Sequence, residues 1–253
     1  MSEGGAMIEF SRVRKVFADG TPALTGVSAS VPLGEFCVLL GSSGAGKTTL
    51  LKMVNGLVPA SDGSISVNRQ SLTRKNLKKI RSQVAMIHQN FAIVPRLTVE
   101  GNIISGAAAQ LPLWRIVTGL YPVGLRRKAA DLCHAVGLNE AQFNRRAAAL
   151  SGGQQQRAGI ARAFITEPQV VLADEPVASL DPKISYDILQ TLRTAARERN
   201  TTVVCSLHQL DLAREFADRI IGMGSGSVVY DGPSDELDEA SIERIYGKVG
   251  PSA

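Results

Sequence analysis

Eight consecutive residues near the start of the chain have the types and spacing of a phosphate-binding loop, G-x-x-x-x-G-K-[ST]. They are Gly41, Ser42, Ser43, Gly44, Ala45, Gly46, Lys47 and Thr48. Glycines let backbone N–H groups crowd around phosphate oxygens, and a following helix adds the partial positive charge of its N-terminus. In such a loop the lysine reaches the β- and γ-phosphates of a nucleotide, and the hydroxyl binds Mg²⁺. We therefore expect Lys47 and Thr48 to hold a nucleotide with its metal ion.

Two adjacent carboxylates, Asp174 and Glu175, end the apolar run Val170–Ala173. Successive side chains of a strand point to opposite sides, so the two acids can do different work. Asp174 is suited to hold Mg²⁺ through water, and Glu175 is suited to orient and polarise an attacking water. The alternative is that both acids cap a following helix, which the phosphate-binding loop in the same chain disfavours.

A second short segment could bind an anion or simply begin a helix. Ser151 is placed to cap a helix in which Ile160 and Phe164 recur at helical spacing. A helix N-terminus next to glycines is also a site for phosphate. Physical chemistry alone favours ordinary capping. The segment consists of Ser151, Gly152, Gly153 and Gln154.

Three single residues are weaker candidates. Gln89 follows the predicted strand Val84–His88 and could bind metal or water, although an isolated glutamine there is usually just solvated. His208 follows the apolar run Thr202–Leu207 and could sense a phosphate, although alone it would more often be structural. Phe17 could stack on a purine ring or serve as a turn or core aromatic.

The elements around these residues predict an α/β architecture. Phe36–Leu40, Val170–Asp174 and Thr202–Leu207 are short apolar runs typical of buried parallel strands. Residues 49–54 form a predicted helix that Asn55 and Gly56 end. The remaining predicted elements are a strand at 8–13 with a turn at 14–20, an antiparallel strand at 64–67, a helical region at 98–150 with a helix at 129–136, a helix that Asp181 and Pro182 begin, and, after His208, a helix and a small hairpin.

Composition sets further bounds. The 253 residues are 44% hydrophobic and 20% charged, with a net charge of +5, as is ordinary for a globular protein. We expect a cytoplasmic protein, because no signal peptide and no apolar stretch of about 18 residues is present. The three cysteines, Cys37, Cys133 and Cys205, lack metal or redox spacing, and the first and last are expected to be buried thiols.

Two surface segments have open interpretations. A basic cluster could touch nucleic acid or anionic headgroups, but it lacks interleaved aromatic residues, which favours a solvated helix face. The apolar stretch Leu111–Pro122, with the only tryptophan, could dock on a partner or a membrane surface, or could equally pack within its own subdomain. The basic cluster consists of Arg69, Arg74, Lys75, Lys78, Lys79 and Arg81.

In order and spacing, these motifs resemble those of the ATP-binding subunits of ABC transporters, over about residues 7–247. The family's motifs fall on an aromatic residue for adenine stacking at Phe17, a Walker A loop at Gly41–Thr49, the Q-loop glutamine Gln89, the signature Leu150–Gln154, the Walker B residues Asp174 and Glu175, the D-loop Ala178–Asp181 and the switch histidine His208.

The resemblance implies a P-loop NTPase fold of the α/β class, with a RecA-like parallel core, an antiparallel β subdomain and a helical subdomain. It implies one domain over residues 7–247, a helical subdomain at about 92–165, and flexible tails at 1–6 and 248–253. Two copies would sandwich two ATP molecules, each between the Walker A loop of one chain, through Thr49, and Ser151–Gln154 of the other.

The resemblance also implies an ATPase that uses ATP and Mg²⁺. The catalytic group would comprise Lys47, Gln89, Glu175 and His208, and Mg²⁺ would be organised by Thr48, Gln89 and Asp174. Expected partners are a second copy, integral membrane permease subunits that meet Gln89 and the helical subdomain, and, indirectly, a periplasmic or extracellular binding protein. The protein would lie peripherally on the cytoplasmic face of the inner membrane, with no nucleic acid partner.

Finer features are similar to the phosphonate-import branch of the family, so the expected cargo is phosphonate or a related phosphorus oxyanion. The alternatives are another ABC transporter, such as an amino-acid importer or an exporter, or a non-transport ABC protein. His88, Phe17 and Thr48 depart from the more usual residues without removing a catalytic group. The branch features are Phe91–Val99, Leu113–Arg115, Asp174–Asp181 and Ser206–Glu215.

Overall fold

The computed structural model describes residues 5–89, 92–178 and 180–247. The strands are β1 (Ala6–Val16), β2 (Pro22–Pro32), β3 (Phe36–Leu40), β4 (Asp62–Val67), β5 (Gln70–Ser71), β6 (Val84–Ile87), β7 (Val170–Asp174), β8 (Thr202–Leu207), β9 (Arg219–Gly224) and β10 (Ser227–Pro233). The helices are α1 (Lys47–Val54), α2 (Leu77–Arg81), α3 (Val99–Ser105), α4 (Leu113–Thr118), α5 (Val123–Ala135), α6 (Glu140–Phe143), α7 (Gly152–Phe164), α8 (Pro182–Glu198), α9 (Leu210–Phe216) and α10 (Glu239–Tyr246), with short 3-10 turns η1 (Ala108–Gln110), η2 (Ala147–Ala149) and η3 (Ser234–Glu236).

The larger sheet has the strand order β10-β9-β3-β8-β7-β6. All neighbouring pairs from β9 to β6 are parallel, and only β10 runs antiparallel, against β9. The carboxyl ends of β3, β7, β8 and β6 therefore meet at one edge. Because ligands of open α/β sheets bind outside that edge, the sheet brings the phosphate-binding loop, the two carboxylates and His208 to the same place. The predicted parallel core is confirmed.

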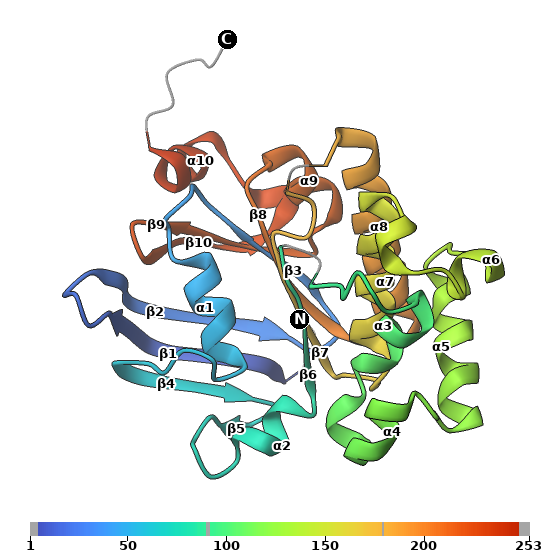
Figure 1. Ribbon diagram of the computed structural model, residues 1–253. Helices are drawn as coiled ribbons and strands as arrows, with labels where there is room; N and C mark the ends of the chain where they lie inside the picture. The colour runs from blue at the N-terminus through green and yellow to red at the C-terminus, as the bar shows by residue number, and fades with distance from the viewer. Residues whose placement is uncertain (1–4, 90–91, 179, 248–253) are drawn as a thin grey trace.

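The smaller sheet is antiparallel, with the order β2-β1-β4-β5. It lies beside the parallel core, on the left of Figure 1, while the helices from α3 to α7 lie on the right. The predicted strand at 64–67 pairs antiparallel with β1, as expected. The predicted turn at 14–20 was too long, because β1 continues to Val16 and pairs with β2, which the sequence did not indicate.

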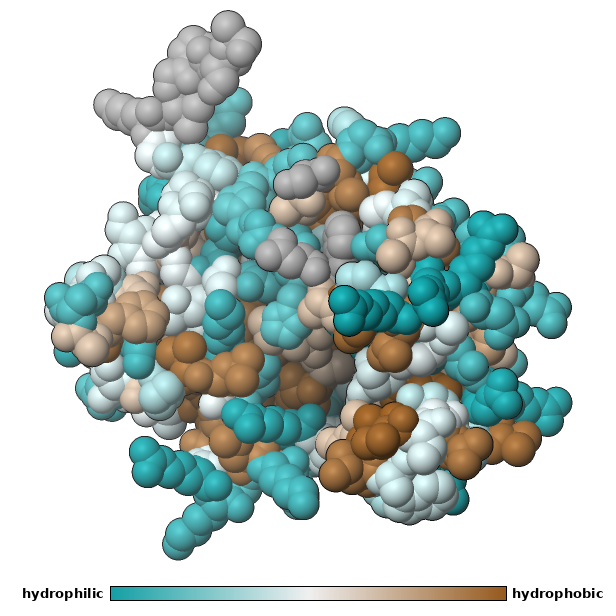
Figure 2. Space-filling view, in the orientation of Figure 1, coloured by the Kyte–Doolittle hydropathy of each residue, from teal (hydrophilic) through white to brown (hydrophobic). Residues whose placement is uncertain are grey.

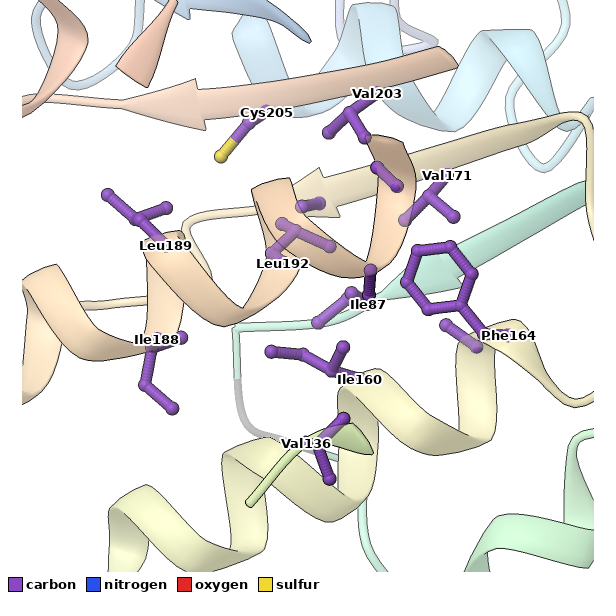
Figure 3. Close-up of a cluster of buried hydrophobic side chains, with 14 of the residues drawn as sticks. Ile87, Val136, Ile160, Phe164, Val171, Ile188, Leu189, Leu192, Val203 and Cys205 are labelled. Carbon is purple, nitrogen blue, oxygen red and sulfur yellow. The ribbon is translucent and has the colours of Figure 1, made fainter. Parts of the chain in front are cut away.

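Two hydrophobic cores lie on the two faces of the parallel sheet. Alternate residues of β3 enter different cores: Val38 faces α7 and α8, whereas Leu39 faces α1 and the antiparallel sheet. This two-sided burial is why the strand is apolar at every position. In Figure 3, Leu192 of α8 and Ile160 of α7 point toward the side chains of the sheet strands.

The helical region is held together by a buried polar residue as well as by apolar packing. Asn102 on α3 accepts a 2.7 Å hydrogen bond from the N–H of Val94 and donates to the carbonyls of Val94 and Thr98. This fixes the chain that enters the helical region. Thr98 caps α3 by accepting from the N–H of Gly101.

Some elements differ from the sequence expectation. The predicted helix at 129–136 begins earlier, at Val123, and Gly137 with its positive φ ends it. The hairpin after His208 is present as β9 and β10, but β9 joins the parallel core, and α10 follows as an additional helix. The expected N-terminal tail is shorter, because β1 begins at Ala6; residues 1–4 and 248–253 lie outside the described residues.

All three cysteines are buried. Burial raises the pKa of the Cys133 thiol to about 11 and raises the pKa values of Cys37 and Cys205 as well. These thiols are therefore protonated and enclosed, as the sequence predicted for Cys37 and Cys205. Across the described part of the chain, no helix has the length and apolar character needed to cross a bilayer.

Candidate nucleotide site

The phosphate-binding loop connects β3 to α1 and depends on glycine at particular positions. Gly46 has φ +99°, and a Cβ there would lie 2.7 Å from the carbonyl oxygen of Ala23. A Cβ on Gly41 would lie 2.5 Å from the carbonyl oxygen of Met223. Both glycines are thus required by backbone conformation or close approach. The loop leads directly into α1, whose N-terminus faces any anion bound in the loop.

Lys47, the first residue of α1, is buried and points back over the loop. Its ammonium group donates to the carbonyl oxygens of Gly41 at 2.8 Å and Ser42 at 2.9 Å. Burial lowers the pKa of Lys47, and the nearby carboxylates of Glu175 and Asp174 partly offset that effect. The lysine therefore places a fixed positive charge inside the loop.

A hydroxyl–carboxylate network links the loop to the neighbouring strands. Thr48 donates a 2.8 Å hydrogen bond from Oγ1 to Asp174 Oδ1. Ser206 on β8 donates to the same oxygen at 3.1 Å. Asp174 is buried, so these two hydroxyls stabilise a carboxylate that has little contact with water.

Glu175 lies beyond the strand rather than in it. Its φ of +48° is in the left-handed region, and its N–H donates a 2.9 Å hydrogen bond to Ser206 Oγ. The expectation that strand alternation separates the two acids is therefore wrong in its reason, because β7 ends at Asp174. The left-handed backbone at Glu175 is energetically costly for a residue with a side chain. It directs the Glu175 carboxylate away from the direction taken by the Asp174 carboxylate.

His208 connects Glu175 to the loop. Its Nε2 contacts Glu175 Oε1, and its Nδ1 lies 3.0 Å from the Gly41 carbonyl oxygen and 3.3 Å from Lys47 Nζ. A carboxylate oxygen accepts here, so Nε2 donates to Glu175. The histidine thus joins the lysine and the glutamate in one chain of hydrogen bonds.

Lys47, Thr48 and Glu175 line a pocket of about 290 Å³ beside the loop, while Asp174 and His208 contact Thr48 and Glu175 without lining it themselves. Phe17, half-exposed after β1, forms one wall, and Lys15 Nζ lies 5.2 Å from the centre of its ring. The aromatic face is thus on the same pocket as the phosphate-binding residues. The pocket is lined by Phe17, Thr21, Pro22, Ala23, Ser43, Gly44, Ala45, Gly46, Lys47, Thr48, Thr49 and Glu175.

Gln89 is not brought to this pocket. It lies after β6, at the same edge of the sheet, with an exposed side chain, and it is not among the residues that line the pocket. His88 beside it is partly buried, and burial together with Arg162 lowers the pKa of the imidazole. The proposed metal-binding group is therefore assembled only in part: Thr48 and Asp174 are in contact, and Gln89 is separate.

The signature segment begins α7 on a different part of the surface. Ser151 is the N-cap; its Oγ accepts from the N–H of Gln154, and Gln154 Oε1 accepts from the N–H of Ser151 at 3.0 Å. A Cβ on Gly153 would lie 3.0 Å from Ile184 Cγ2, so this glycine lets α7 approach α8. None of the residues 151–154 lines the pocket beside the phosphate-binding loop.

Sequence reasoning missed two residues that hold the site in place. Ser206 bridges Asp174 and the Glu175 backbone, and its polarity within the apolar strand β8 was an available signal. Gln156 on α7 is fully buried and donates a 2.6 Å hydrogen bond to the carbonyl oxygen of Pro176, in the turn after Glu175. Nothing in the sequence pattern distinguished Gln156 from its neighbours Gln154 and Gln155.

Comparison with known proteins decides the family. A family model described as ABC transporter matches residues 24–178. The chain belongs to the ABC transporter family. The matched residues include the phosphate-binding loop and the two carboxylates Asp174 and Glu175, but not His208. The chain is called the cassette below.

Similar curated proteins share the name phosphonates import ATP-binding protein PhnC. One from Hydrogenovibrio crunogenus is 49% identical over 240 residues, covering 95% of this chain and 88% of the relative. One from Staphylococcus epidermidis is 41% identical over 246 residues, covering 96% of this chain and 95% of the relative. The chain is thus an ABC ATPase along almost its full length.

Solved ABC cassettes share the fold. The ATP-binding cassette MJ0796, solved as a dimer bound to ADP and Pi, is 33% identical with a TM-score of 0.75, over 90% of this chain and 99% of that one. CbiO1 from Clostridium perfringens is 26% identical with a TM-score of 0.81, over 94% and 93% of the two chains. The predicted ABC ATPase fold is confirmed.

Proposed function

We propose that this cassette hydrolyses ATP to drive uptake of phosphonate or a related phosphorus oxyanion by an ABC importer. The main support for this cargo is the 49% identity, over 95% of the chain, with a phosphonates import ATP-binding protein. The 41% identity with a relative of the same name from a different genus supports it. The cargo itself would bind elsewhere, because the pocket of the cassette is built for a nucleotide.

The roles of the site residues follow from their contacts. Lys47 and the loop amides, with the neighbouring Thr49, would bind the nucleotide phosphates, and Phe17, which lines the same pocket, would stack on the base. Glu175 would orient and polarise the attacking water. His208, already in contact with Glu175 and 3.3 Å from Lys47 Nζ, would align that carboxylate with the γ-phosphate.

The donors of the site fit Mg²⁺, a hard cation that prefers oxygen ligands. The Thr48 hydroxyl and the Asp174 carboxylate lie 2.8 Å apart and provide such oxygens, while Gln89 would add its amide oxygen when the site closes. Mg²⁺ would neutralise charge on the phosphate oxygens. Ser206 would keep the Asp174 carboxylate oriented through its 3.1 Å hydrogen bond.

Two cassettes would act as a homodimer. The signature residues lie outside the pocket of their own chain, and Ser151 is exposed. The capping box uses the N–H groups of Ser151 and Gln154, but those of Gly152 and Gly153 have no intrahelical partner and could be offered to an anion. We infer that Ser151, Gly152, Gly153 and Gln154 complete the site of the second copy. The D-loop would lie at the same interface; its Ser179 is outside the described residues.

The permease would dock in a groove of about 730 Å³ between α2 and the end of α7. Ala85 and Met86 of β6, which are close in sequence to Gln89, line this groove, so a helix of the permease seated here would be linked to the nucleotide site. The cassette would thereby lie peripherally on the cytoplasmic face of the membrane. An extracellular or periplasmic binding protein would deliver cargo to the permease without touching the cassette.

We further propose that residues 7–247 form one ABC domain, with a helical subdomain at about 92–165. The contacts of α3 with α5, α6 and α7 support a separate helical unit. It would move against the parallel core when ATP binds, and α7 would carry the signature residues with it.

The test is ATP hydrolysis by the complete transporter in proteoliposomes, with its binding protein, against a panel of phosphonates, phosphite and polar amino acids. We expect phosphonates or phosphite to raise ATP turnover and amino acids to leave it unchanged. A complex carrying Glu175→Gln controls for contaminating ATPases. Stimulation by amino acids alone would contradict the proposed cargo, while ATP hydrolysis itself would still be present.

A further inference from the structure

The surface of α4 and the start of α5 is apolar and open. The side chains of Leu113, Trp114, Val117, Leu120 and Val123 are between 54% and 83% exposed. Of the two interpretations of this stretch, internal packing holds only for its ends, Leu111 and Tyr121, which pack partly against the core. Contiguous apolar surface of this kind marks an interaction site.

The charge around this surface is mostly positive. Residues 63–130 contain eleven of the 28 Lys and Arg residues but only one of the 23 Asp and Glu residues, Glu100. The segment therefore carries a net charge of +10, and the rest of the chain carries −5. Glu100 pairs with Arg126 and Glu167 pairs with Lys128, which leaves the six cations of residues 69–81, in and before α2, as the main positive group.

Basic and apolar side chains occupy one side of the molecule. In Figure 2 the hydrophobic side chains over α4 and the hydrophilic side chains around β5 and α2 lie along the same lower edge. The groove described above lies between them, because Arg74, Lys78 and Arg81 line one side of it, and Ala109 and Gln110, which lead into α4, line the other. We call the surface formed by residues 69–81 and 113–127 the α2–α4 face.

We propose that the α2–α4 face binds the headgroup region of an anionic lipid bilayer. Trp114 and its apolar neighbours would enter the boundary between headgroups and acyl chains, where tryptophan is favoured. The α2 cations would contact lipid phosphates, each contributing to the attraction within a Debye length of the surface. Arg115, whose guanidinium lies 5.0 Å from the centre of the Trp114 ring, would keep its charge at the headgroups.

The charge distribution selects a lipid surface over an apolar protein partner. A protein helix that covered only α4 would leave the cations of α2 uncompensated, whereas an anionic bilayer is extended enough to contact both parts of the face. This inference goes beyond the proposed function, since it concerns no cargo. It agrees with the proposed position of the groove, where a permease embedded in the same membrane would dock.

The chain contains a natural probe, because Trp114 is its only tryptophan. The full chain, without permease, is titrated with vesicles of phosphatidylglycerol and phosphatidylcholine in equal parts, and with vesicles of phosphatidylcholine alone. We expect the emission of Trp114 to shift to shorter wavelength with the anionic vesicles only, and the shift to weaken as salt is added. No shift with anionic vesicles at low salt would overturn the proposal.

Variants separate the two halves of the face. Leu113→Ser with Val117→Ser, and Lys75→Glu with Lys79→Glu, should each weaken vesicle binding by at least about tenfold. Leu33→Ser is the matched control, since Leu33 is 49% exposed but lies between β2 and β3. It should bind vesicles as the wild type does. All variants should keep the basal ATPase rate, because the changed residues lie outside the nucleotide site.

A protein occupant gives a different result. If purified permease in detergent shifts the Trp114 emission while anionic vesicles do not, a protein covers α4 and the lipid proposal is wrong. The vesicle assay contains no permease and no cargo. If the proposed transport function is wrong, the result of the vesicle assay does not change. Failure of the transport proposal and failure of the lipid proposal can therefore be told apart.

Discussion

Thr48 on the phosphate-binding loop donates a 2.8 Å hydrogen bond from its hydroxyl to the Asp174 carboxylate at the end of β7. The two residues are 126 positions apart, and only the parallel pairing of β3, β8 and β7 brings them together. The buried Asp174 accepts from Ser206 as well. The sheet therefore brings together the hydroxyl and the carboxylate that the proposed Mg²⁺ site would use.

Thr48 can be tested through its hydroxyl. Thr48→Val keeps the shape of the side chain but removes the oxygen. It should raise the Mg²⁺ concentration needed for half-maximal ATP hydrolysis by about 10–100-fold. Thr48→Ser retains the hydroxyl and should stay close to wild type. Steady-state turnover as a function of Mg²⁺ concentration measures the effect. Equal behaviour of the two variants would remove Thr48 from the metal site.

Glu175 should separate nucleotide binding from hydrolysis. Glu175→Gln keeps size and hydrogen-bonding capacity but loses the base, so ATP should still bind while turnover falls by at least about 100-fold. Nucleotide binding is measured by calorimetry and turnover by phosphate release. Glu198→Gln, an exposed acid at the end of α8, should leave both unchanged. Near-normal turnover of the Glu175 variant would rule out the assigned role.

Phe17 should contribute to ATP affinity through its ring. Stacking of a base on an aromatic residue contributes about 1–3 kcal/mol. Phe17→Ala should therefore raise the Kd for ATP by roughly 5–150-fold. Phe17→Tyr keeps the ring and should bind normally. The Kd is measured by calorimetry, and an unchanged value in the alanine variant would show that Phe17 serves only the turn after β1.

Gln156 offers a test of the link between α7 and the turn after Glu175. Gln156→Glu would place a buried carboxylate against the Pro176 carbonyl oxygen, so the free energy of unfolding should fall by about 3 kcal/mol at neutral pH. Burial raises the pKa of such an acid, and the protonated form can donate to Pro176 again. Stability should therefore recover as the pH is lowered. Urea unfolding at two pH values measures this.

The control for Gln156 is Gln190→Glu, an exposed site on α8. This change should alter the free energy of unfolding little at either pH. If both variants lose the same stability, the effect comes from added charge rather than from the contact with Pro176.

Glu35 should make the cassette less stable as the pH rises. Burial, together with the carboxylates of Asp218 and Asp231, raises its pKa above the ordinary value of 4.5, although Arg219 opposes this. The folded state thus binds this proton more tightly than the unfolded state, and that stabilisation is lost as the pH rises through the folded pKa. Glu35→Gln should therefore raise the Tm at neutral pH, with the gain fading toward about pH 4. A lower Tm at neutral pH would contradict this.

The elements that carry the site were predictable because each has a strong local signal. Phe36–Leu40 is apolar throughout since both faces of β3 are buried, and the glycines of the loop are fixed by sterics at Gly41 and Gly46. The capping of α7 by Ser151 and of α8 by Asp181 also followed from local hydrogen bonding. Those features depend on residues that are close together in the chain.

What could not be predicted depends on residues far apart in the chain. β9 pairs with β3 across about 180 residues, and no local pattern distinguishes it from a simple hairpin strand. The left-handed Glu175 depends on Ser206, which only the sheet brings near. Gln156 was missed for the same reason, because its partner Pro176 is twenty residues away. Polar contacts of this kind can be predicted only when the pairing of the strands in three dimensions is known.

The burial of the three thiols has a practical consequence for spectroscopy. Since Cys37, Cys133 and Cys205 are all enclosed and protonated, a cysteine introduced on α4 would be the only thiol open to a maleimide reagent. A spin label or fluorophore could be attached there without replacing any native residue. The approach of the cassette to a membrane, and of one copy to another, could then be followed as a distance during ATP turnover.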